Sequence, residues 1–145
     1  MKKLKKLSLL LLICSAGWLF AEEAAPPKEL KLTGTFTWNG DRAGRRGDGK
    51  NGRCNVKAVL TPTDKPNSYT AVYTFMWDKS ERHFDGTFVR NPQTGEVSGT
   101  AKTGGRTWEF KGKTVNGVMA CQHFETSNGK RSNDGDVAFT EDKNS

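Results

Sequence analysis

Apolar and polar residues alternate with a period of two along most of the chain beyond its N-terminal segment. In the run 30–38, Leu32, Phe36 and Trp38 fall on one side, while lysine and threonine fall on the other. The run 69–77 repeats this alternation with tyrosine, phenylalanine and tryptophan. Such a pattern is typical of antiparallel strands with one buried face. No window of comparable length keeps a helical period, so the pattern predicts an all-β domain.

Turn-forming residues divide the alternating runs into short segments. Asn-Gly and Gly-Gly pairs supply the positive φ angles that tight hairpins require. Short connections favour antiparallel pairing between sequential neighbours, which predicts a meander. The eight expected strands are 30–38, 53–60, 69–77, 82–90, 96–102, 106–113, 117–125 and 135–140.

A short internal repeat indicates how this sheet is shaped. An apolar–x–Gly–Thr/Lys pattern recurs around Gly34, Gly86, Gly99 and Gly112, each time with the glycine on the inward side. Glycine within a strand often marks a bend or a close approach, and repeated bends let a sheet curl. We therefore expect an eight-stranded up-and-down barrel or a strongly curled sheet, with two packed sheets as the open alternative.

The segment Gly34-Thr35-Phe36-Thr37-Trp38-Asn39, which opens this meander, resembles the first strand of avidin- and lipocalin-type (calycin) barrels. The resemblance covers this motif of six residues and the general strand plan. It implies an eight-stranded barrel that binds a small molecule at one mouth. It assigns no ligand contacts residue by residue.

The N-terminus has the form of a secretory signal. Four lysines within 1–6 precede an uncharged, leucine-rich run at 7–20, and Ala21 follows. This order matches the n-region, h-region and small cleavage-site residue of exported proteins. We expect cleavage after Ala21 and a secreted or periplasmic protein. The expected parts are a signal at 1–21, a polar tether at 22–29, a barrel domain at 30–141 and a tail at 142–145.

Length and charge limit the function classes. The 145 residues suffice for one domain, and the formal charge of +7 falls to +3 once the four signal lysines are removed. A nearly balanced mature chain argues against nucleic acid as the partner, because phosphate backbones select strongly basic surfaces.

Positive charge is concentrated in one glycine-rich segment, which carries a net charge of +4 over residues 41–57. It could bind an anionic partner such as an acidic glycan or lipid headgroups. The alternative is a solvated hairpin loop without a partner. The candidate anion-binding residues are Arg42, Arg45, Arg46, Lys50 and Arg53.

Aromatic residues with inward parity could line a ligand cavity, because an eight-stranded barrel has room for one small ligand or for its own side chains. A small hydrophobic or aromatic ligand is the expected occupant, and a filled core is the alternative. The candidate ligand-binding residues are Phe36, Trp38, Tyr73, Phe75, Trp77, Phe88, Trp108 and Phe110.

No motif indicates catalysis, a metal or a cofactor. The chain has no nucleophile elbow and no phosphate-binding glycine loop. Its two histidines, His83 and His123, are interpreted as solvent-facing strand residues without metal-ligand spacing. We expect a monomeric, non-catalytic binding protein. The alternatives are a structural envelope protein without a discrete ligand and, third, a hydrolase-type enzyme.

Two cysteines, Cys54 and Cys121, remain after signal removal, and an exported protein could join them in a disulfide. The alternation argues against this pairing. Cys54 shares parity with apolar neighbours, whereas in the strand of Cys121 the apolar residues Ala120 and Phe124 have the opposite parity. The sequence therefore does not decide whether the disulfide forms.

Overall fold

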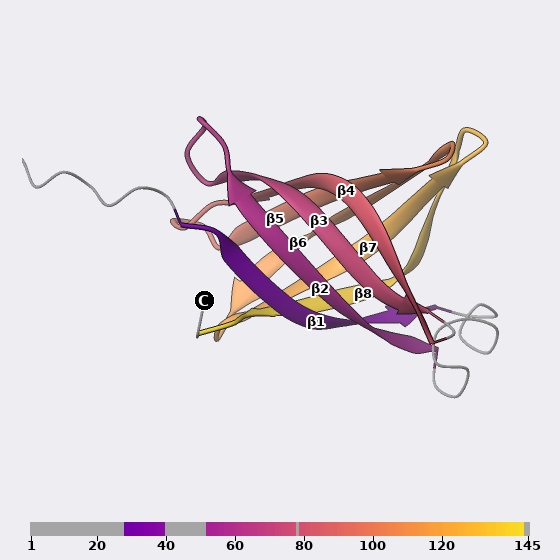
Figure 1. Ribbon diagram of the computed structural model, residues 1–145, viewed down its shortest axis with the longest axis horizontal. Coiled ribbons are helices and arrows are strands. Elements are labelled where there is room, and N and C mark those ends of the chain that lie inside the picture. Colours follow the sequence, from indigo (N-terminus) through magenta and orange to yellow (C-terminus); the bar gives the residue numbers. More distant parts are fainter. Residues whose placement is uncertain (1–27, 40–51, 78, 144–145) are drawn as a thin grey trace, which may run out of the picture.

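The structure, a computed structural model, describes residues 28–39, 52–77 and 79–143. The predicted all-β meander is confirmed: each strand pairs antiparallel with the next, and β1 also pairs with β8, so the sheet closes into a barrel (Figure 1). This closure excludes the open sheet and the two-sheet alternative. The eight strands are β1 (Leu30–Trp38), β2 (Arg53–Pro62), β3 (Ser68–Trp77), β4 (Ser80–Arg90), β5 (Glu96–Thr103), β6 (Arg106–Val115), β7 (Val118–Ser127) and β8 (Lys130–Glu141).

The predicted hairpin turns are present. Asn116 and Gly117 have φ angles of 52° and 78°, and Asn128 and Gly129 have angles of 50° and 74°. Two consecutive positive φ angles are characteristic of the type I′ turn, whose twist matches that of paired strands. Because the second of these turns is so short, β8 begins at Lys130 and not at the predicted residue 135.

The inward glycines allow the barrel to close tightly. A Cβ atom on Gly34 would overlap the carbonyl oxygen of Ala138, and one on Gly86 would overlap that of Thr100. Gly112 approaches the backbone of a neighbouring strand in the same way. Three of the four repeat glycines therefore permit a close approach of adjacent strands, since a side chain there would push the strands apart. At Gly99, a Cβ atom would instead meet the ring of Phe110.

The inward face of β7 differs from the expectation. Met119, Cys121, His123 and Glu125 are buried, whereas Phe124 points outward. Its ring is covered from outside by Arg131, whose guanidinium carbon lies 3.8 Å from the ring centroid. The interpretation of His123 as solvent-facing and of Phe124 as inward is thus wrong, because the outward aromatic ring obscured the phase of the strand.

The two ends of the barrel differ in their contents. One end, here called the terminal end, carries both described chain ends and the β2–β3, β4–β5 and β6–β7 turns (Figure 1). Its interior is filled by the buried side chains of Leu32, Leu60, Ala71, Phe88 and Met119. The opposite end, here called the cavity end, is where β1 leads toward β2 and where the β7–β8 turn lies.

Candidate functional site

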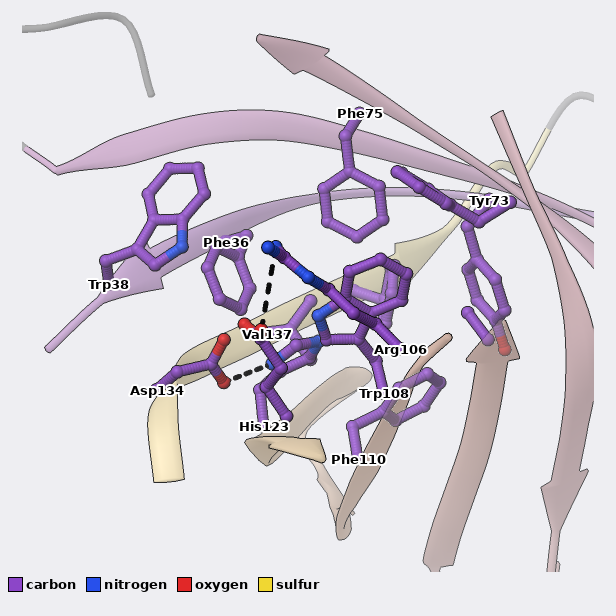
Figure 2. Close-up of a pocket in the computed structure, with 14 residues that line it drawn as sticks. Phe36, Trp38, Tyr73, Phe75, Arg106, Trp108, Phe110, His123, Asp134 and Val137 are labelled. Carbon is purple, nitrogen blue, oxygen red and sulfur yellow. Dashed lines mark hydrogen bonds and ion pairs between the residues drawn. The ribbon is translucent and has the colours of Figure 1, made fainter. Parts of the chain in front are cut away.

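The cavity end contains a hollow inside the barrel, with a volume of about 60 Å³. Figure 2 shows side chains from several strands pointing into it. Most of them are aromatic, and a small polar group lies on one wall. The lining residues are Phe36, Trp38, Tyr73, Phe75, Phe84, Ala101, Arg106, Trp108, Phe110, His123, Glu125, Asp134, Val137 and Phe139.

The aromatic rings support one another by edge-to-face contacts. The ring centroids of Phe36 and Trp38 are 4.7 Å apart, those of Phe75 and Phe84 are 5.5 Å apart, and those of Phe84 and Trp108 are 4.9 Å apart. Such contacts favour fixed ring orientations, because the edge of one ring is attracted to the face of the next. The walls of the cavity are therefore formed before any ligand arrives.

A β-bulge places Asp134 inside the barrel. His123 pairs with Gly135 and Phe124 pairs with Asn133, so Asp134 has no partner residue in the register between β7 and β8. An extra residue of this kind re-aims its side chain. The Asp134 carboxylate faces inward and is buried, although an uninterrupted alternation from Gly135 would have turned it outward.

Inside the barrel, Asp134 meets the buried imidazole of His123. The Nδ1 atom of His123 lies 2.6 Å from Oδ1 of Asp134, a short hydrogen bond (Figure 2). The imidazole also contacts the ring of Phe36 edge-on, with centroids 4.5 Å apart. This pair fixes the orientation of the imidazole, because one ring nitrogen is held by the carboxylate and the ring face is packed.

A second polar pair joins β6 to β7. Oε1 of the buried Glu125 lies 3.7 Å from a guanidinium nitrogen of Arg106. The Arg106 side chain is 50% exposed, whereas that of Glu125 is 7% exposed. Figure 2 shows the Arg106 side chain extending over the cavity. The guanidinium therefore sits between the solvent at the cavity end and the carboxylate inside.

Deeper in the barrel, the titratable groups are held neutral. The Tyr73 hydroxyl donates a hydrogen bond to the carbonyl oxygen of Thr87 over 2.6 Å. Burial raises the pKa of this phenol well above its usual value, and the nearby Cys121 contributes in the same direction. Burial alone raises the pKa of the Cys121 thiol to about 12. Neither group supplies a nucleophile at neutral pH, because the thiol and the phenol stay protonated.

The structure brings most of the predicted ligand-binding residues together. Six of the eight line the cavity: Phe36, Trp38, Tyr73, Phe75, Trp108 and Phe110. Phe88 lies instead in the filled terminal end, where it is 1% exposed. The backbone of Trp77 ends β3, but its side chain lies outside the described part of the structure.

The predicted anion-binding segment is described only at its edge. Arg42, Arg45, Arg46 and Lys50 lie outside the described residues. Arg53 is exposed at the start of β2, where it lines a depression on the outer wall together with Lys111 and Asp136. The backbone N–H of Trp38 donates to the carbonyl oxygen of Gly52 over 2.8 Å, so both of these residues lie at the cavity end.

The two cysteines are separate free thiols, both buried in the barrel interior. In the register, Cys54 is opposite Phe36, Phe36 is opposite Val137, and Val137 is opposite Cys121. Three strand spacings separate the cysteines by about 14 Å around the wall and about 11 Å straight across. A disulfide needs Cα atoms within about 7 Å, so the pairing left open by the sequence is not formed here. The opposite parity inferred for these residues is also wrong, since both face inward.

Four polar residues of the cavity were not predicted. His123 and Glu125 follow from the true phase of β7, which the outward Phe124 concealed. Arg106 stands next to the Gly104-Gly105 turn and resembles an ordinary turn residue. For Asp134, the only signal is an Asn-Asp-Gly sequence, which also reads as a turn; here it forms the bulge.

Within the described ranges, no group of three or more His, Cys, Asp and Glu residues is arranged to hold a metal ion. The described residues also contain no helix long and apolar enough to cross a membrane. No protein-family model matches the chain, and no curated protein or solved structure matches it at a significant level.

Proposed function

We propose that this protein is a non-catalytic binding protein that holds one small, largely apolar ligand inside the cavity end of the barrel. The observation that carries the proposal is the asymmetry of the interior. Side chains fill the terminal end, whereas an aromatic-lined hollow lies at the other end, with one buried polar pair and a second pair whose Arg106 is half exposed. Ligand sites are commonly apolar cavities with a few placed polar groups, often at the mouth of a barrel.

The proposal is consistent with the resemblance to calycin-type barrels, which implies a ligand at one mouth. We further propose that the protein is exported, with cleavage after Ala21, and acts as a monomer. The ligand is small, because a hollow of about 60 Å³ is far below the roughly 300 Å³ or more of drug-sized sites. A somewhat larger molecule would fit once the half-exposed Arg106 side chain moves aside.

Filling the hollow tests this function. Ala101 is buried and lines the cavity, so Ala101→Leu adds three carbon atoms to the space a ligand needs. The same substitution at the exposed Ala120 on the outer wall of β7 is the matched control. Small aromatic compounds are titrated against both variants, with tryptophan fluorescence and melting temperature as readouts.

We expect the parent protein and Ala120→Leu to bind with a fluorescence change from Trp38 or Trp108. A ligand at 100 times its Kd stabilises the native state by about 2.7 kcal/mol, which raises the melting temperature measurably. Ala101→Leu should melt normally without ligand and lose the ligand response. Equal responses from the two variants would place the binding outside the barrel.

A further inference from the structure

The charged groups buried beside the cavity indicate which ligands it accepts. Glu125 and Asp134 are both buried and both face the hollow. Each of them already has a basic neighbour: His123 lies beside Asp134, and Arg106 lies beside Glu125. A buried charge is costly unless an opposite charge accompanies it. A cation placed beside Glu125 would therefore keep an opposite charge next to this buried carboxyl group, whereas an anion placed there would not.

Arg106 already places a cation at this position. The 3.7 Å between its guanidinium nitrogen and Glu125 exceeds the approximately 2.7–2.9 Å of a direct charge-assisted hydrogen bond. Half of the side chain remains in solvent. An ion pair that is long and half exposed is weak, so a better-fitting cation could displace it.

The aromatic walls favour the same class of ligand. Phe36, Trp38 and Trp108 come from β1 and β6 and surround the polar pairs (Figure 2). The face of an aromatic ring carries partial negative charge and attracts an ammonium or guanidinium group. The apolar remainder of the ligand would contact the other rings. Carboxylates and rings thus act together on one molecule that has a charged head and an apolar body.

We propose that the ligand is an organic cation, an amine or amidine carried on a small apolar ring, whose charged group replaces the Arg106 guanidinium beside Glu125. This inference rests on the proposed function, because it assumes that the cavity binds a ligand. Arg106 then acts as a displaceable plug, because its guanidinium stands at the position beside Glu125 that the charged group of the ligand takes.

Four probes of similar size and different charge test the inference. Benzylamine and benzamidine carry a cation, benzyl alcohol is neutral and benzoate is an anion. Each is titrated by calorimetry against the parent protein. We expect the cations to bind at least about tenfold more tightly than the alcohol, in line with a hydrogen bond to a buried charged group. Benzoate should bind most weakly.

Two variants test whether Glu125 and Arg106 determine the preference for cations. Glu125→Gln should weaken benzylamine binding about tenfold and leave the Kd of benzyl alcohol within about twofold. Arg106→Gln should strengthen benzylamine binding severalfold, because it removes the competing cation. The control is Arg131→Gln, which removes the same charge from the outer wall, where Arg131 lies 3.1 Å from Glu109. It should leave every affinity unchanged. Circular dichroism and melting curves establish that each variant is folded.

The outcomes separate the two proposals. If benzyl alcohol binds as tightly as benzylamine, the cation inference is overturned and the ligand-binding function stands. Tighter binding of benzoate would overturn it as well. If none of the four probes binds, both proposals fail for ligands of this size. If Glu125→Gln does not fold, Arg106→Gln still decides, since unchanged amine affinity there would contradict the role of Arg106 as a plug.

Discussion

The buried pair of His123 and Asp134 allows a quantitative prediction of what the bulge in β8 contributes to stability. The two side chains are 7% and 3% exposed, and their hydrogen bond is 2.6 Å long. Replacing either partner with alanine leaves the other with an unsatisfied polar atom in the barrel. Such an orphaned group costs about 1–3 kcal/mol, and more when it is charged. We therefore expect each of His123→Ala and Asp134→Ala to lower the free energy of unfolding by about 3 kcal/mol.

A double-mutant cycle isolates the pair from other effects. The His123 ring also packs against Phe36, but that loss occurs in both the single and the double variant and cancels. A hydrogen bond to a charged group contributes about 1.5–3 kcal/mol, so we expect a coupling energy of about 2 kcal/mol. Urea unfolding at pH 7, extrapolated linearly to water, provides the four stabilities.

The ion pair of Arg131 and Glu109 supplies the control cycle. Its distance of 3.1 Å is comparable, but both side chains are substantially exposed. Exposed pairs typically couple by about 0.2–1 kcal/mol. If the buried cycle gives a coupling no larger than this control, burial does not strengthen the interaction, and the reasoning that the buried hydrogen bond between His123 and Asp134 stabilises the fold is refuted.

Three further predictions follow from the interior. The stability contributed by Cys121 should be fully present below pH 9 and fall between pH 9 and 12, because its thiol loses the proton near pH 9 when unfolded and keeps it to about pH 12 when folded. For this one group, the free energy of unfolding falls by at most about 1.4 kcal/mol per pH unit. Urea unfolding of Cys121→Ala should show a shallower decline with pH. Mass spectrometry after alkylation without reductant should find Cys54 and Cys121 slow to react when folded and fully modified in denaturant; a recovered peptide linking them would contradict the barrel register. Gly34→Ala should lower the free energy of unfolding by at least about 2 kcal/mol in the same urea assay, because its Cβ meets the rigid carbonyl of Ala138; an unchanged midpoint would show that the close approach of β1 and β8 is not required.

The strand plan could be predicted from the sequence because it depends on local rules. Alternation with a period of two marks a strand wherever one face is buried. Asn-Gly pairs specify tight turns through their positive φ angles, as at Asn116-Gly117. Short turns leave few choices of neighbour, so the meander follows. The glycine repeat around Gly34 and Gly86 also indicated curvature, since a missing side chain permits the close strand approach seen there.

The polar half of the cavity could not be predicted in this way. Phe124 faces outward in β7, where Arg131 of the neighbouring strand covers its ring, and this contact between strands is not visible in the sequence of β7 alone. The position of Asp134 depends on one residue that the register between β7 and β8 leaves unpaired. The first effect has no signature within β7, and the Asn-Asp-Gly sequence around Asp134 is equally typical of a turn.

The sequence by itself determined the number, order and pairing of the strands, and most of the aromatic residues that face the barrel interior. Only the tertiary structure decided that one end is hollow, and that a histidine and two carboxylates share it with Arg106. The physical reason is the distance along the chain over which each interaction acts. Strand formation and turns arise from neighbours in the chain, whereas a cavity is the volume left over when side chains from all eight strands have packed together.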